Sequence, residues 1–332
     1  MSNSVGALSR AATCYVAGHG GLVGSAIVRH LRRQGFSDIV GARSSQLDLR
    51  DRAATRAFFD RKRPDVVIGA AARVGGILAN SQRPVEFLGE NLRIQLNLLD
   101  TAHEFGVERL LFLGSSCIYP KFAPQPISES SLLTGPLEET NDAYAIAKIA
   151  GITQVQSYRR QYGRRWISAM PTNLYGPGDN FDLQSSHVLP ALLRKFHEAV
   201  LGGQPEVVVW GSGRPRREFL HVDDLASACL FLLEHYDESA PINVGVGKDL
   251  EIRELAELVA DITGFGGRIV FDTSKPDGTP RKLLDVSRLA RLGWSPSIEI
   301  ADGVASTYRW FLDNAGDPRH PPSAFQSAGL DS

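Results

Sequence analysis

The chain has 332 residues, of which 43% are hydrophobic, and 36 basic side chains nearly balance 37 acidic ones, giving a net charge of −1. A chain of this length can bury a large core and suits one large domain or two. The near-neutral, interspersed charge favours neither a nucleic-acid partner nor a membrane surface. The three cysteines are widely spaced, without the pairing of a metal site, and this suits a reducing compartment.

The two ends of the chain have the composition of tails. Residues 1–12 lack the apolar stretch of a signal peptide, and residues 317–332 are rich in Pro, Ser and Gly. Both segments are expected to be disordered. No apolar run reaches the length of a membrane span, so we expect a cytoplasmic protein.

Strand and helix patterns alternate between residues 13 and 172. This alternation is typical of an α/β fold with a Rossmann-type, doubly wound parallel sheet. Strands are predicted at 13–17, 38–42, 66–70, 109–114 and 166–170, and helices at 21–34, 51–62, 84–105 and 144–162.

After Pro171 the sequence becomes richer in Gly and Pro, and its elements become shorter. Residues 173–316 are predicted to form a smaller C-terminal α/β lobe over the carboxyl edge of the sheet. Residues 222–244 are expected to return to the sheet, so the lobe is discontinuous. Its predicted helices are 188–200, 222–235, 252–263 and 302–314, and its predicted strands are 207–210, 242–244 and 269–271.

A glycine-rich turn joins the first strand to the first helix. Its glycines follow a G-x-x-G-x-x-G pattern at Gly18, Gly21 and Gly24. Such a turn brings backbone N–H groups close to a pyrophosphate at the helix N-terminus. The pattern indicates a dinucleotide site.

Two further patterns carry acid–base chemistry. The apolar strand 109–114 ends in Ser115, at the sheet edge where open α/β folds bind ligands. Tyr144 and Lys148 lie one helical turn apart, where an ammonium group lowers the pKa of a nearby phenol. Taken together and in this order, the glycine turn, the serine and the Tyr-x-x-x-Lys pair resemble the extended short-chain dehydrogenase/reductase family.

Longer motifs narrow the resemblance to the GDP-L-fucose synthases and cover about residues 13–312. They are 70–77 (AAARVGGI), 113–120 (LGSSCIYP), 171–177 (PTNLYGP), 209–213 (VWGSG), 217–224 (REFLHVDD) and 275–282 (KPDGTPRK). The resemblance implies an enzyme that inverts C3 and C5 of GDP-4-keto-6-deoxy-D-mannose and then reduces C4 with NADPH. It also implies a homodimer through the helices 84–105 and 144–162.

The resemblance assigns roles to residues of this chain. Ser115, Tyr144 and Lys148 would serve the reduction, and Cys117 and His187 the epimerisation. Without the family, a buried thiol and a surface histidine are the more common interpretations of the last two. The cofactor positions would be Gly18, His19, Gly20, Gly21, Leu22, Val23, Gly24, Arg43, Leu113, Gly114, Ser115, Ser116, Tyr144, Lys148, Pro171, Thr172, Asn173, Leu174 and His187, and the substrate positions Lys195, Trp210, Arg217 and Asp277.

Two positions depart from the family pattern. Gly20 replaces an arginine that often meets the 2′-phosphate of NADPH, and Arg73 replaces a lysine. Arg43 ends the second strand, and no acidic residue accompanies it there to bind a bare ribose, so NADPH is still expected. The alternative for Arg43 is an ordinary solvated side chain.

Two other functions fit the same fold. One is a nucleotide-sugar 4-epimerase or 4,6-dehydratase, which recycles a tightly held NAD instead of consuming NADPH. The other is a non-enzymatic nucleotide-binding protein, although Ser115, Tyr144 and Lys148 are all present here.

Overall fold

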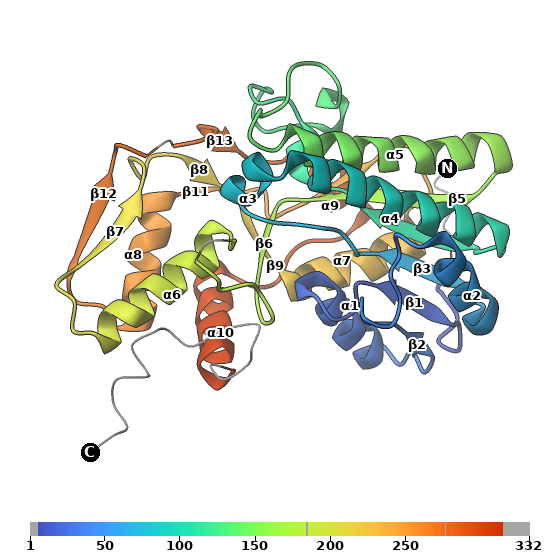
Figure 1. Ribbon diagram of the computed structural model, residues 1–332, viewed down its shortest axis with the longest axis horizontal. Helices are drawn as coiled ribbons and strands as arrows, with labels where there is room; N and C mark the ends of the chain where they lie inside the picture. Colours follow the sequence, from blue (N-terminus) through green and yellow to red (C-terminus); the bar gives the residue numbers. More distant parts are fainter. Residues whose placement is uncertain (1–5, 184, 276, 315–332) are drawn as a thin grey trace.

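The computed structural model describes residues 6–183, 185–275 and 277–314. Figure 1 shows a larger α/β unit on the right and a smaller one on the left. The helices are α1 Leu22–Arg33, α2 Arg52–Lys62, α3 Ile77–Gln82, α4 Pro84–Glu104, α5 Asp142–Tyr162, α6 Val188–Leu201, α7 Val222–His235, α8 Ile252–Thr263, α9 Ser287–Leu292 and α10 Ile300–Asp313. Two 3-10 turns are η1 Ser116–Ile118 and η2 Glu129–Ser131.

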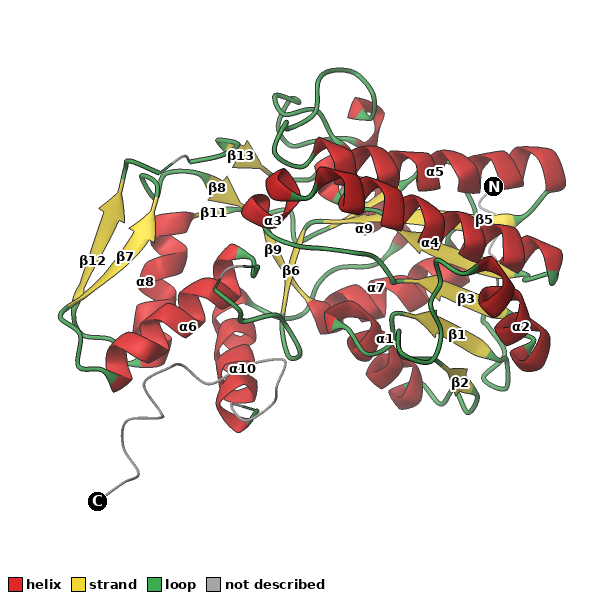
Figure 2. Ribbon diagram, in the orientation of Figure 1, coloured by secondary structure: helices red, strands yellow, loops and turns green. Residues whose placement is uncertain are grey.

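A six-stranded sheet forms the centre of the larger unit, in the order β10-β5-β4-β3-β1-β2, and all its neighbouring strands are parallel. The strands alternate with helices in the chain (Figure 2), which confirms the predicted doubly wound fold. They are β1 Cys14–Ala17, β2 Ile39–Val40, β3 Val66–Gly69, β4 Arg109–Leu113, β5 Arg165–Pro171 and β10 Ile242–Val244.

Helices cover both faces of this sheet. α4 and α5 pack side by side on one face, and α1 packs against α7 on the other (Figure 1). Strand residues are buried on both faces, as expected of a parallel sheet between helical layers. Because both faces are covered, ligands can approach the sheet at the ends of its strands.

The smaller unit contains short sheets and the helices α6, α8 and α10. Its apolar core joins these helices to β7 and β9. One sheet has the order β11-β8-β13, and the pairs β12–β7 and β6–β9 form two others. The strands are β6 Asn173–Tyr175, β7 Glu206–Trp210, β8 Arg216–Arg217, β9 Phe219–His221, β11 Leu250–Glu251, β12 Arg268–Asp272 and β13 Arg281–Lys282.

Some predictions of local structure were wrong. Residues 6–12 are not a free tail, because the Leu8 N–H and the Arg10 guanidinium both bond to Glu234, the latter at 2.6 Å. Helix α3 was not predicted, because its six residues are too few to show a helical pattern. Residues 1–5 and the predicted tail 317–332 lie outside the described residues. Among the helices described, none has the length and apolar character required to cross a membrane.

Candidate active site

The carboxyl end of β4 delivers the first part of the site. Gly114 follows the strand, and a Cβ there would lie 2.4 Å from the Met170 sulfur, so a larger residue would require the Met170 side chain to move. Ser115 then caps η1, since its hydroxyl accepts a hydrogen bond from the Cys117 N–H at 3.3 Å. The sharp turn after the strand thus places a hydroxyl and a thiol at the sheet edge.

Helix α5 delivers the second part of the site. Its first turns carry Tyr144, whose phenol interacts with the Ser115 hydroxyl, and Lys148, whose Nζ donates to the Leu113 carbonyl at 2.8 Å. The same Nζ lies 5.8 Å from the centre of the Tyr144 ring. The structure therefore brings these three residues together at the end of β4.

The pKa values of this group correct one prediction. Lys148 was expected to lower the pKa of Tyr144, but burial and the nearby Cys117 raise it, while Ser115 opposes this shift. Burial also lowers the pKa of Lys148 to about 8. Because a carbonyl, rather than the phenol, accepts from the ammonium, Tyr144 keeps its proton at neutral pH and is ready to donate it.

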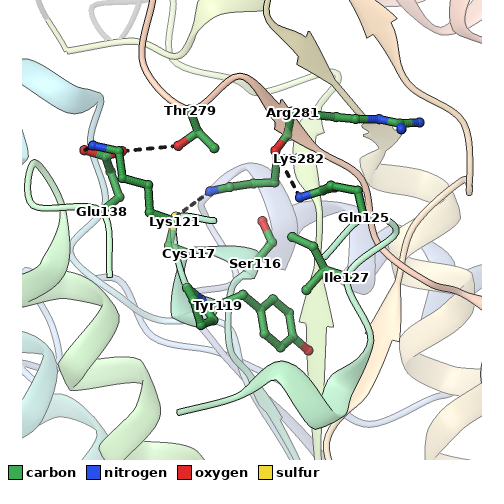
Figure 3. A pocket seen from close by; sticks show the side chains of 11 residues that line it. Ser116, Cys117, Tyr119, Lys121, Gln125, Ile127, Glu138, Thr279, Arg281 and Lys282 are labelled. Carbon is green, nitrogen blue, oxygen red and sulfur yellow. Dashed lines mark hydrogen bonds and ion pairs between the residues drawn. The ribbon is translucent and has the colours of Figure 1, made fainter. Parts of the chain in front are cut away.

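Cys117 lies against a pocket between η1 and the strand β13 (Figure 3). Its sulfur accepts from Asn141 Nδ2 at 3.4 Å and from Lys282 Nζ at 3.9 Å. The buried inert thiol considered from the sequence does not describe this residue, which is only partly buried and polar in its contacts.

His187 comes from a different element, as the residue that precedes α6. The loop before it packs on the segment after β3, where the Gly76 N–H donates to the Ser185 carbonyl at 3.1 Å. The residue as a whole is exposed, but desolvation by the protein packed around its ring lowers the pKa of His187 below its usual value. Its neutral form is therefore favoured near neutral pH.

The glycine turn has the shape of a phosphate cradle. A Cβ at Gly24 would lie 2.1 Å from the Gly18 carbonyl oxygen, so glycine lets α1 begin directly on the turn. Gly18 itself has a φ of +83°, while the space beside Gly20 is open. Among the described residues no side chain caps the start of α1. These residues fit a dinucleotide pyrophosphate, whose oxygens the first N–H groups of the helix would bind.

Arg43, expected to contact the 2′-phosphate, and Arg73, which departs from the family lysine, lie in different surroundings. The Arg43 side chain is exposed after β2, on the edge of the sheet that carries the glycine turn. Arg73 is instead paired with Glu90 at 3.1 Å and lies over the Phe87 ring. Arg43 is thus the better candidate for contact with a phosphate.

Glu218 ties the predicted cofactor loop to the smaller unit. Its carbonyl accepts from Thr172 Oγ1 at 3.3 Å and from Asn173 Nδ2 at 2.8 Å. Its buried carboxylate accepts the N–H groups of Val246 at 2.6 Å and Leu284 at 3.1 Å. One residue therefore fixes the ends of β5 and β10 and the segment after β13 relative to one another.

The predicted substrate positions lie in the smaller unit. Trp210 is 61% exposed, which excludes a core role, and lysine ammonium groups lie over its ring at 5.5 Å (Lys195) and 5.6 Å (Lys275). This arrangement offers a flat aromatic face beside two positive charges.

Arg217 and Asp277 differ in what they can do. Arg217 is partly buried and interacts electrostatically with Cys117, so it reaches the same site. Asp277 accepts from the Ser212 N–H at 2.6 Å and from the Ser212 hydroxyl at 2.8 Å. Its carboxylate holds the turn that follows Trp210.

The sequence interpretation missed Asn141 and Lys282 as site residues. Lys282 was part of a recognised motif without a role, and it lies 165 positions from the thiol that it contacts. Asn141 lies three residues before Tyr144 on the turn that opens α5, and this is the one local signal that could have pointed to it.

Comparisons with known proteins agree with this geometry. Residues 14–245 match the model of the NAD dependent epimerase/dehydratase family. The chain is 59% identical to GDP-L-fucose synthase 1 of Arabidopsis thaliana (92% of this chain, 94% of the relative) and 55% identical to GDP-L-fucose synthase of Escherichia coli K12 (90% and 96%). The structure of a GDP-L-fucose synthetase from Naegleria fowleri bound to NADP superposes with a TM-score of 0.89 at 32% identity (96% and 99%). The chain therefore belongs to the GDP-L-fucose synthase branch of the NAD dependent epimerase/dehydratase family.

Proposed function

We propose that this protein converts GDP-4-keto-6-deoxy-D-mannose to GDP-L-fucose, by epimerisation at C3 and C5 and reduction at C4. The observation that carries the proposal is one strand end, where Ser115 and Tyr144 lie beside Cys117. A ketone held there meets hydroxyl donors and a thiol at once. The identity of 54–59% to GDP-L-fucose synthases supports the same substrate.

Epimerisation begins with removal of a proton next to the ketone. The thiolate of Cys117 takes the proton, an S–H bond forms, and the electron pair of the C–H bond moves into an enolate. Ser115 and Tyr144 donate hydrogen bonds to its oxygen, which stabilises the charge that develops. His187 returns a proton to the opposite face from its imidazolium form, so exchange should slow as the pH rises through the lowered pKa of His187.

Reduction uses the same oxygen contacts. NADPH, when bound at the glycine turn, supplies the hydride for C4. Tyr144 donates its phenolic proton to O4, and Ser115 holds that oxygen in place. Lys148 positions the end of β4 through the Leu113 carbonyl and offers its remaining N–H groups to the nicotinamide ribose.

The substrate's GDP group would lie along the smaller unit. Arg217 and Lys195 would bind the diphosphate, with the arginine giving a fork of two hydrogen bonds. The exposed ring of Trp210 gives a face for stacking. Asp277 acts on this surface by holding the turn after Trp210.

A preference for NADPH over NADH is expected to depend on Arg43. Arg43→Ala should raise KM for NADPH roughly tenfold, because a charge-assisted bond to the 2′-phosphate is lost, and leave KM for NADH nearly unchanged. Steady-state kinetics with both coenzymes measures this. Arg50→Ala is the matched control, since that exposed arginine is already paired with Asp48 at 2.8 Å. Equal changes for both coenzymes would show that another group binds the 2′-phosphate.

The proposed function is tested by incubation with GDP-4-keto-6-deoxy-D-mannose and NADPH. GDP-L-fucose should form with one NADPH consumed for each product molecule. Turnover without consumption of NADPH would indicate instead a 4-epimerase or 4,6-dehydratase that recycles NAD. Binding of the nucleotide sugar without any product would indicate a non-enzymatic member of the family.

We also infer a homodimer through α4 and α5. These helices pack together on the outer face of the sheet and expose apolar side chains, among them Leu96 (45%), Ile146 (47%) and Tyr162 (52%). A second copy is a suitable cover for such a helical face. Sedimentation velocity should give twice the chain mass, and the double variant Leu96→Glu, Ile146→Glu should shift it to the monomer. A monomeric native protein would refute the inference.

A further inference from the structure

The Cys117 sulfur accepts two N–H donors, and nothing in the proposed reaction has yet used them. Lys282 extends from β13 with its Nζ directed at the sulfur, 3.9 Å away (Figure 3). Asn141 donates its Nδ2 at 3.4 Å from the turn before α5. Donors of hydrogen bonds and positive charges both favour a thiolate over a thiol.

The other cations of this pocket are neutralised by carboxylates. Lys121 pairs with Glu138 at 3.2 Å, and Arg281 pairs with Asp249 at 2.5 Å. Within the described part of the chain, Lys282 forms no ion pair. Its charge is therefore directed at the sulfur without a carboxylate to offset it.

The other charged and titratable groups around the thiol do not cancel the effect of the Lys282 charge on the sulfur. Strand pairing sets Arg217 opposite Lys282, which adds a second positive charge to the same side. Tyr144 faces the sulfur from α5, and its raised pKa keeps it neutral near pH 7. The carboxylate that lines the pocket, Glu138, is held by Lys121 and by the Thr279 hydroxyl at 3.2 Å.

We propose that Lys282, assisted by Asn141, keeps Cys117 in its thiolate form in the resting enzyme. Lys282 is thus a positioning residue that acts through the sulfur and prepares it to remove a proton from the substrate. The proposal rests on the proposed function, in which Cys117 is the base. Asn141 suits the task because its buried Oδ1 has no partner among the described residues, which leaves its amide free to turn toward a thiol proton after transfer.

The reactivity of the thiol tests the proposal without any substrate. Iodoacetamide reacts with thiolates, and the other two cysteines are buried with thiol pKa values raised to about 12, so labelling near neutral pH reports Cys117. The labelling rate of the native enzyme should rise with a midpoint below the usual thiol value of ~8.5. Lys282→Met should move this midpoint up by roughly 1–3 pH units.

Four further variants make the test specific. Lys282→Arg should retain a low midpoint, because the charge is kept. Asn141→Asp should raise the midpoint, because a carboxylate replaces the donor. Lys275→Met is the matched control, since that lysine of the same segment lies over Trp210 instead and should leave the labelling profile unchanged. Cys117→Ser should abolish labelling.

The outcomes separate this inference from the proposed function. An unchanged midpoint in Lys282→Met, or in Lys282→Gln if the first variant does not fold, overturns the role of Lys282, even if the native enzyme still makes GDP-L-fucose. A change only in KM for the GDP-sugar would likewise assign Lys282 to substrate binding. If Lys282→Met shifts the labelling midpoint but the native protein shows no epimerase activity, the role of Lys282 in stabilising the thiolate stands and the proposed function is refuted.

Discussion

Replacement of Tyr144 by Phe should lower kcat for the reduction by about 10²–10⁴, because the proton for O4 then has no donor. The loss should not extend to coenzyme binding, since Lys148 bonds to the Leu113 carbonyl and not to the phenol. Stopped-flow oxidation of NADPH measures the chemical step, and fluorescence titration measures the dissociation constant of NADPH.

Tyr162→Phe is the matched control for this variant, because it removes a phenol from the exposed end of the same helix α5. It should behave as the native enzyme does. Turnover in Tyr144→Phe within a factor of two of the native rate would show that another group protonates O4.

Cys117→Ser should separate the two activities of the enzyme. A serine hydroxyl is a far weaker base than a thiolate, so uptake of deuterium from D₂O at C3 and C5 should fall by at least 10²-fold. Hydride transfer does not use the thiol, so an already epimerised 4-keto intermediate should still be reduced. NMR of the product in D₂O measures exchange, and consumption of NADPH measures reduction.

Cys229→Ser is a suitable control for the loss of a thiol, because that cysteine lies on α7 and is fully buried in the apolar core. It should exchange both positions at the native rate, although it will be less stable. Exchange by Cys117→Ser at the native rate would mean that the base is another residue. His187→Ala should also block full epimerisation, and exchange left at only one carbon would show which proton His187 delivers.

Much of the fold could be predicted because its signals are local. The helix at residues 222–235 has the predicted limits, since a histidine cap, two acids in the first turn and regular apolar spacing all mark it. The parallel strands could be predicted from buried apolar runs between helices. The interaction of Ser115 with Tyr144 could be expected from the resemblance to the family, which assigns both residues to one active site.

The parts that could not be predicted depend on contacts between residues that are far apart in the sequence. Strands β8 and β13 have two residues each, too few for a pattern, yet their register places Lys282 beside Arg217 and over the thiol. Likewise, the pKa of Tyr144 is raised by burial, and the spacing of residues along the helix does not show how deeply a side chain will be buried. Helix α5 does place Lys148 one turn after Tyr144, but its ammonium group donates to the Leu113 carbonyl and not to the phenol.

The order in which the chain is made matters for the sheet. Five of its strands end by Pro171, while β10, which pairs with β5, begins only at Ile242. At ~5–20 residues per second, a ribosome needs roughly 4–14 s to synthesise the intervening segment. During that time β5 is an open edge that can pair with another nascent chain, and α7 has not yet covered its face of the sheet. A chain cut near residue 172 should therefore aggregate instead of forming a free nucleotide-binding domain, and successful biosynthesis depends on the last third of the message.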